Sequence, residues 1–340
     1  EALKTILRCI SQLKADTVSV GIFPEGRINK YRKLAHFRPG VFKIAQKADL
    51  PIVVCTIRDT YDIECACLEC GSTKVLSGST NRKAVKLAWV HCDLQKAMKD
   101  PAGFAAKTKK YYEKYDQVVC VSRLGQQSFR ELFGNDIPTR IVHNTVDCRE
   151  ILESAREEIS NLPQGPLVVS LGRLAEPKCF LRLLKAHKRL LEEGIRHNLL
   201  ILGEGPEREM LEAFVRENHL GDTVSMPGFR TNPYPYLRCA DVLACTSDYE
   251  CFSTFITEGL ILGKPIVTTD ASGMGEILEE GEYGLITGID DDDFYEGLKK
   301  MLLEEDLRQE YARKAALRGR DFATEKLVAD TERYFEEWIR

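Results

Sequence analysis

One stretch, residues 241–279, constrains the fold more than any other. Residues 242–245 are an apolar run that leads into the acidic loop 248–250. An apolar helical run follows until Gly263-Lys264-Pro265, and a second strand-like run, 266–268, comes next. Strand, loop, helix and strand in this order form one unit of a parallel α/β sheet. Ligands of such sheets bind at the carboxyl ends of strands, beside helix N-termini, so we expect a binding site after residue 245.

Two carboxylates lie at this expected site. Glu258 follows Glu250 by eight residues, about two turns if the helix begins nearby. Both can then line one crevice without touching, which suits a polyhydroxyl ligand that is held from two sides. The alternative is that Glu250 is an ordinary acid at a helix N-terminus and Glu258 a salt-bridge partner.

This pair, with the Glu-Gly-Leu and Gly-Lys-Pro-Ile-Val that follow, resembles the Glu-x7-Glu motif of retaining glycosyltransferases with the GT-B fold. The nearest resemblance is to family 4 (glycosyl transferases group 1), which includes many bacterial cell-surface and lipopolysaccharide transferases. It runs from about residue 61 to the C-terminus. The implied fold class is α/β of the GT-B type, with two Rossmann-like parallel-sheet domains facing a cleft.

A second motif precedes the first. A predicted strand, 166–171, leads into Gly172-Arg173-Leu174-Ala175-Glu176-Pro177-Lys178 and an amphipathic helix to residue 193. In the family that this motif resembles, the Arg and Lys clamp the donor diphosphate, so Arg173 and Lys178 become candidate leaving-group stabilisers. Fixed cations stabilise the developing phosphate charge without a metal. The alternative is two solvated loop cations.

The resemblance also implies substrate contacts. Glu250 would contact donor sugar hydroxyls and Glu258 the ribose, with backbone N–H groups near the sugar or phosphate and a base site beside residues 227–230. The candidate binding residues are Glu258, Gly172, Gly205, Phe229, Arg230, Phe252 and Ser253. Gly205 lies in a turn after the predicted strand 199–203, where glycine lets backbone approach a ligand and Pro206 suits a first helical turn.

Two cysteines depart from the family pattern, which has glycine after the motif lysine and after the first motif glutamate. Here these positions are Cys179 and Cys251. Where such a position needs positive φ, a cysteine costs about 1 kcal/mol or more.

Residues 60–150 resemble part of the family's N-terminal acceptor domain. Strand-like runs lie at 61–77, 86–91, 115–122 and 139–144, and an amphipathic helix at 123–133. His91 ends the second run, where a histidine can assist catalysis by hydrogen bonding to the sugar or acceptor. The alternative for His91 is a histidine packed under a loop.

Residues 1–59 resemble a different family, the lysophosphatidate (1-acyl-glycerol-3-phosphate) acyltransferases. The motif FPEGRINK implies a phosphate-binding turn made of Glu25, Gly26 and Arg27. The His-x4-Asp pair of that family's chemistry is missing from the sequence. We therefore expect a non-catalytic fragment and an incomplete or chimeric N-terminal domain.

Composition narrows the class of protein. At 340 residues the chain can form two domains, and a net charge of −4 gives no indication of nucleic-acid binding. It has no apolar run of membrane-spanning length and no signal peptide, and its start at Glu1 suggests a fragment. Twelve scattered cysteines indicate reduced cytosolic thiols, and the cluster Cys65, Cys67 and Cys70 lacks the second pair of a zinc knuckle.

The expected domains are 1–59, 60–150, 165–322 and a C-terminal crossover helix, 323–340. A charged segment at 151–160 followed by a linker at 161–165, a helix at 302–320 and a helix-capping acidic run at 290–293 complete the expectation.

The predicted function is transfer of a hexose, with retention and without a metal or cofactor. The donor would be a UDP-sugar or GDP-sugar and the acceptor a hydroxyl of a glycan or lipid-linked glycan. We expect a cytoplasmic protein, and peripheral association with the inner membrane face is compatible with such acceptors. The alternatives are a nucleotide-sugar-binding protein without turnover, a fusion-derived protein, and an acyltransferase-related protein.

Overall fold

The computed structural model describes residues 63–160 and 162–338. Glu25, Gly26 and Arg27, with the whole predicted acyltransferase-like fragment, lie outside these residues. The described residues fall into two compact units, 63–90 with 108–118 and 91–107 with 119–338. The described residues form two sheets, and each is described by itself.

The first sheet has the strand order β1-β2-β3-β4. Strands β1 (Ile63–Ala66) and β2 (Val85–Val90) are parallel, with Ile63 opposite Val85. The predicted strand at 61–77 is wrong beyond its first residues, because helix α3 (Gly71–Leu76) replaces its second half. Cys70 adopts a φ of +62° before this helix, and the buried residues Ser72, Thr73 and Leu76 repeat at helical rather than alternating spacing.

The next elements in the chain complete the first sheet and precede the second. They are α4 (Leu94–Ala97), α5 (Pro101–Tyr112), β3 (Gln117–Cys120), α6 (Arg123–Phe133), β4 (Thr139–Ile141) and α7 (Cys148–Ser154). Helix α6 has the predicted bounds, and the charged segment 151–160 begins inside α7. Asp147 caps α7 by accepting a hydrogen bond from the N–H of Glu150 at 3.0 Å. An acid at the N-cap with a glutamate three residues later begins a helix even in a charged segment.

The second sheet is entirely parallel and has the order β10-β9-β8-β5-β6-β7. Its strands are β5 (Leu167–Leu171), β6 (Asn198–Leu202), β7 (Val224–Gly228), β8 (Val242–Cys245), β9 (Ile266–Thr269) and β10 (Leu285–Thr287). This is the Rossmann order, in which the chain reverses its direction of travel between β5 and β8. The carboxyl ends of β5 and β8 therefore form the expected ligand site.

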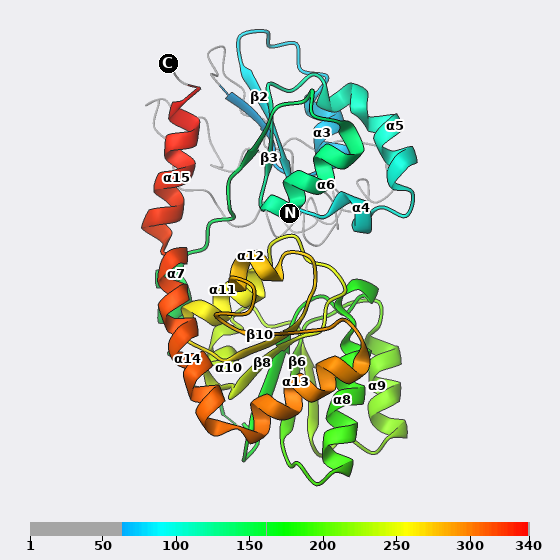
Figure 1. Ribbon diagram of the computed structural model, residues 1–340, viewed down its shortest axis with the longest axis vertical. Coiled ribbons are helices and arrows are strands. Elements are labelled where there is room, and N and C mark those ends of the chain that lie inside the picture. The colour runs from blue at the N-terminus through cyan, green and yellow to red at the C-terminus, as the bar shows by residue number, and fades with distance from the viewer. Residues whose placement is uncertain (1–62, 161, 339–340) are drawn as a thin grey trace, which may run out of the picture. The chain divides into compact units, whose positions relative to one another are not determined.

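Helices connect these strands and cover the sheet. They are a 3₁₀ turn (Glu176–Lys178), α8 (Phe180–Glu192), α9 (Arg208–Glu217), α10 (Tyr234–Cys239), α11 (Thr254–Ile261), α12 (Met274–Leu278), α13 (Asp291–Leu303), α14 (Glu305–Gly319), a second 3₁₀ turn (Arg320–Phe322) and α15 (Thr324–Glu336). Helix α13 packs on α8 and α14 on α11 (Figure 1). The predicted crossover of the last helix stays a prediction.

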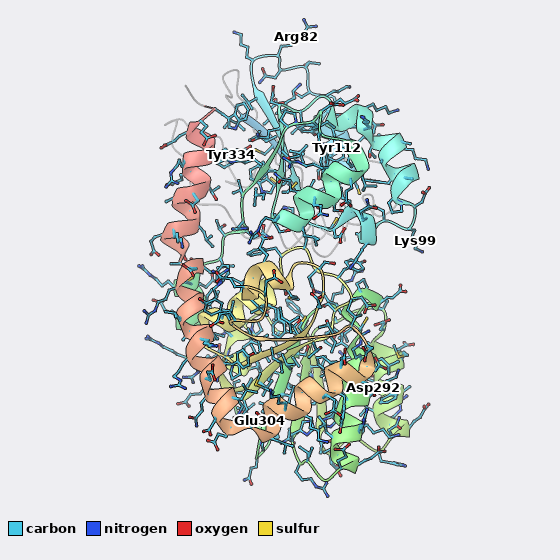
Figure 2. All side chains as sticks on the ribbon, in the orientation of Figure 1. Arg82, Lys99, Tyr112, Asp292, Glu304 and Tyr334 are labelled. Atoms are coloured by element: carbon cyan, nitrogen blue, oxygen red, sulfur yellow. The ribbon has the colours of Figure 1, made fainter. Side chains whose placement is uncertain are left out.

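Three predicted boundaries near this sheet differ from the structure. The helix expected over 302–320 is broken at Glu304, labelled in Figure 2, where an extended backbone separates α13 from α14. Helix α9 begins at Arg208, two residues after Pro206. Pro227 lies inside β7 rather than in a loop, because β7 is an edge strand and can spare one backbone donor.

The acidic run at 290–293 caps a helix, as predicted. Asp290 accepts a hydrogen bond from the N–H of Asp293 at 2.8 Å. Asp292, labelled in Figure 2, lies in the first turn of α13, where negative charge favours the helix dipole.

The core of the second sheet explains its stability. Strands β8 and β9 are buried at every position, as parallel strands covered on both faces are. The inner face of α8 contributes Phe180, Leu183, Leu184 and Leu190, all at most 2% exposed. Among the described residues no helix is both long and apolar enough to cross a membrane.

The two cysteines at family glycine positions differ in backbone conformation. Cys179, between the first 3₁₀ turn and α8, has a φ of +48°, whereas Cys251 keeps a negative φ and is 4% exposed. We expect Cys179→Gly to raise the free energy of unfolding by about 1 kcal/mol, because glycine removes the left-handed strain.

The matched variant Cys251→Gly should lower the free energy of unfolding by about 1–2 kcal/mol, since it leaves a cavity and adds backbone freedom. Urea unfolding of both variants checks this contrast. Equal effects of one sign would contradict the assignment of strain to residue 179.

Candidate functional site

The candidate site lies at the carboxyl ends of β5 and β8, where the strand order reverses. A small cavity of about 10 Å³ opens there, with room for about one water. Polar groups from both strand ends reach it, together with three aromatic or apolar side chains. Its lining residues are Ser170, Leu171, Lys178, Phe180, Cys245, Thr246, Ser247, Glu250, Ser253 and Phe255.

An ion pair between Lys178 and Glu250 lines this cavity. The ammonium Nζ of Lys178 contacts Oε1 of Glu250, and the two side chains are 30% and 13% exposed. Ser247 donates a second hydrogen bond to the same oxygen at 2.8 Å. A cation and a carboxylate from separate predicted motifs therefore meet at one point.

Hydrogen bonds to backbone carbonyls of the loops after β5 and β8 explain this meeting. The hydroxyl of Thr246 donates to the carbonyl of Lys178 at 2.8 Å, and the N–H of Asp248 donates to the carbonyl of Pro177 at 2.9 Å. Arg182, on α8, adds a 2.7 Å hydrogen bond to the carbonyl of Thr246. The Lys178 backbone is thereby held against the end of β8.

Glycine 273 supports the other member of the pair. Its N–H donates to the carbonyl of Glu250 at 2.9 Å. A Cβ at this position would lie 2.2 Å from the carbonyl oxygen of Cys251, so any side chain would displace the loop. The turn after β9 therefore needs glycine here to hold the backbone of Glu250.

Glu258 lies on α11, apart from the ion pair. Burial raises the pKa of its carboxyl to about 7, although a 3.4 Å hydrogen bond from the hydroxyl of Tyr234 acts in the opposite direction. Glu258 makes no salt bridge with any described residue. A half-desolvated acid with one neutral donor is a group that can still accept a ligand hydroxyl.

The glycines predicted to meet a ligand also meet protein backbone. A Cβ on Gly203 would lie 1.8 Å from the carbonyl oxygen of Gly172, and one on Gly205 would lie 2.2 Å from that of Leu174. The N–H of Leu174 donates to the carbonyl of Glu204 at 2.9 Å. These glycines let the loops after β5 and β6 pack together, and contact of Gly172 or Gly205 with a ligand stays a prediction.

The remaining candidates are spread over several elements. Arg173 is exposed in the loop after β5, and His91 is half-buried immediately after β2. Phe229 is 58% exposed after β7, next to Arg230. Phe252 and Ser253 are buried directly before α11, whose first N–H groups follow. Only Lys178, Glu250 and Ser253 among all candidates line the cavity, and the roles of the others stay predictions.

Sequence reasoning missed three hydroxyl groups of this site. Thr246 and Ser247 follow β8 and are at most 1% exposed, and Thr269 at the end of β9 is fully buried. Hydroxyl residues at the end of an apolar strand could have indicated these groups, because buried hydroxyls need hydrogen-bond partners. Their partners could be found only from the fold.

Comparison with known proteins identifies two segments. Residues 153–318 match the family "Glycosyl transferases group 1" and residues 1–58 match the family "Acyltransferase". Both predicted resemblances are confirmed, the first of them over residues 153–318.

The curated relatives are transferases. A Campylobacter jejuni N-acetylgalactosamine-N,N'-diacetylbacillosaminyl-diphospho-undecaprenol 4-alpha-N-acetylgalactosaminyltransferase is 33% identical over 196 residues, 57% of this chain and 52% of the relative. The lipopolysaccharide core biosynthesis glycosyltransferase LpsE of Rhizobium meliloti is 28% identical, over 59% of this chain and 58% of the relative. The chain thus spans about half the length of the curated relatives it matches.

Solved structures agree on the fold. Anabaena HepE, in complex with UDP, has a TM-score of 0.69 at 18% identity, with 88% of this chain and 82% of HepE covered. TarM of S. aureus has a TM-score of 0.65 at 17% identity, with 79% of this chain and 53% of TarM covered. The prediction of two parallel-sheet α/β domains of the GT-B type is confirmed, and the cleft between them stays a prediction.

Neutralisation of Lys178 by Glu250 can be measured directly. We expect Glu250→Gln to bind inorganic pyrophosphate more tightly by about 1 kcal/mol, or roughly fivefold, because the ammonium loses its internal counter-charge. The control Glu282→Gln removes an exposed carboxylate that pairs with Lys314 and should leave binding unchanged. Calorimetric titration at low salt checks both, and unchanged or weaker binding by Glu250→Gln would contradict the idea.

The raised pKa of Glu258 predicts a pH-dependent stability. The folded state keeps the proton up to a pKa of about 7, whereas the unfolded chain loses it near 4.5. This group's contribution is therefore fully present below pH 4.5 and is lost as the pH rises to 7, by about 3 kcal/mol.

Glu258→Gln cannot titrate, so the variant should lose less stability than the parent chain between pH 5 and pH 8. Urea unfolding at both pH values measures the difference. Parallel stability curves for the two proteins would show that Glu258 titrates normally.

Proposed function

We propose that this chain is a glycosyltransferase that moves a hexose from a nucleotide-diphosphate sugar to a hydroxyl acceptor. The observation that carries this proposal is the Lys178–Glu250 pair at the reversal point of the second sheet, inside the segment that matches glycosyl transferases group 1. A cation suits a diphosphate and a carboxylate suits sugar hydroxyls. One ligand that carries both groups would engage both side chains.

The nucleotide we propose is UDP, with GDP as the alternative. HepE is solved with UDP and with UDP-glucose, and TarM with UDP. The acceptor we propose is a glycan or a lipid-linked glycan, because the relatives are named for an undecaprenol diphosphate acceptor and for lipopolysaccharide core biosynthesis. Such acceptors fit a cytoplasmic protein that works at the inner membrane face.

The proposed reaction retains the configuration at the sugar and needs no metal or cofactor. Lys178 and Arg173 would stabilise the charge that develops on the leaving diphosphate. Glu250 would orient the sugar through a hydroxyl, and Glu258 would accept a hydrogen bond from the ribose. In the front-face path that the family resemblance implies, the leaving phosphate takes the acceptor proton, and His91 assists at the sugar or acceptor.

A second candidate function is nucleotide-sugar binding without turnover. The positive φ of Cys179 beside Lys178 favours it, because strain at this loop can keep the cation from its working position. Both candidates predict donor binding, and only the first predicts transfer.

The test is calorimetric titration with UDP, GDP and UDP-glucose. The parent chain should bind one nucleotide with micromolar affinity, and Lys178→Ala and Arg173→Ala should each lose about tenfold or more. Lys299→Ala, which removes a half-buried cation paired with Glu193, serves as the matched control and should bind normally. Absence of nucleotide binding by the parent chain would overturn the proposal.

Transfer is then measured on a lipid-linked glycan acceptor by mass spectrometry and by NMR of the new linkage. An α-linked product from an α-linked donor, unchanged in EDTA, is the expected result. An inverted linkage or loss of activity in EDTA would contradict retention or metal independence. Binding without transfer would favour the second candidate.

A further inference from the structure

The side chain of Glu250 is held on one oxygen only. Both hydrogen bonds that its carboxylate accepts from described residues go to Oε1, one from Lys178 and one from Ser247. Oε2 is therefore the oxygen that remains for a ligand. Since Glu250 also lines the cavity, the contacts to Oε1 decide the orientation in which Oε2 is offered.

Only one of the two contacts to Oε1 is expected to remain after the donor binds. Lys178 is the cation that we assign to the donor diphosphate, so a bound donor draws its ammonium away from Glu250. Ser247 is fully buried, and we assign no donor group to its hydroxyl. After the donor binds, the hydroxyl of Ser247 remains as the contact that holds Oε1.

We propose that Ser247 is a positioning residue that keeps Glu250 aimed at the donor sugar once Lys178 has turned to the diphosphate. This inference rests on the proposed function, because it assigns the sugar to Glu250 and the diphosphate to Lys178. Ser247 acts through Glu250 and does not itself contact the sugar.

The hydrogen-bond chemistry of Ser247 supports this role. A serine hydroxyl has a single proton, and an ionised carboxylate is a stronger acceptor than a thiol, so this proton goes to Glu250 at 2.8 Å. The thiol of Cys245, 3.5 Å away, is left to donate toward the same hydroxyl oxygen. The contact with Cys245 therefore does not compete with the hydrogen bond to Glu250.

Thr269 fixes Ser247 from the neighbouring strand. Its hydroxyl donates to the carbonyl of Ser247 at 2.6 Å, and both residues are fully buried. The chain of contacts runs from the end of β9 through Ser247 to Glu250. A rigid strand end thereby sets the orientation of a carboxylate that stands on a loop.

The test compares two ligands that differ only in the sugar. We expect Ser247→Ala to bind UDP within about twofold of the parent chain. Its dissociation constant for UDP-glucose should rise about tenfold, since only the sugar contact depends on Glu250. A purely structural role would weaken both ligands together, and that outcome, like no change in either, would overturn the proposal.

Two further variants sharpen the comparison. Thr269→Val keeps the side-chain volume and removes the hydroxyl, so it should shift UDP-glucose binding in the same direction by a smaller factor. Thr331→Val removes a hydroxyl from α15, outside the sheet, and should change neither ligand. An effect of Thr331→Val as large as that of Ser247→Ala would refute a specific link to Glu250.

Crystal structures of ligand-free Lys178→Ala and Lys178→Ala/Ser247→Ala test the inference without any nucleotide, because both variants lack the ammonium that also holds Oε1. The carboxylate of Glu250 should keep its orientation in the first variant and leave it in the second. The same orientation in both variants would overturn the role of Ser247, whatever the chain binds. Failure of the parent chain to bind UDP or GDP would instead overturn the proposed function, so the two failures are distinguishable.

Discussion

The hydrogen bonds between the loop after β5 and the loop after β8 are the contacts on which the candidate site depends. Thr246 holds the carbonyl of Lys178, and the N–H of Asp248 holds that of Pro177. Without these bonds, two loops more than sixty residues apart in sequence would place a cation and a carboxylate independently. Because both loops start from adjacent parallel strands, the sheet core supplies the rigidity that the loops lack.

The site is also balanced in charge before any ligand arrives. A lysine or a glutamate alone in a half-buried cavity would carry an uncompensated desolvation penalty. In the pair, the attraction between the two charges offsets part of this penalty. Glu258 is kept apart from this pair and is mostly protonated below pH 7 because burial raises its pKa. One carboxylate therefore compensates a charge while the other stays available to neutral hydroxyls.

Local patterns predicted much of this arrangement. The bounds of α6 follow from its helical periodicity and those of β8 from its apolar run, and the meeting of Lys178 with Glu250 agrees with their motifs. Periodicity failed at α3, where a cysteine with positive φ ends the strand pattern. Ser247 was missed because its partner depends on how β8 lies against β5 and β9, which no local pattern encodes. The predicted domain limits and the cleft stay predictions.

The register of β8 has a consequence for the evolution of such a site. Thr246 and Ser247 are consecutive, and one hydroxyl is directed to the backbone of Lys178 while the other is directed to the side chain of Glu250. Both residues directly follow β8, so a slip of this strand by one residue against its neighbours would displace both hydroxyls at once. A one-residue insertion or deletion in β8 would therefore disturb both contacts together, whereas a substitution of either residue would remove only one.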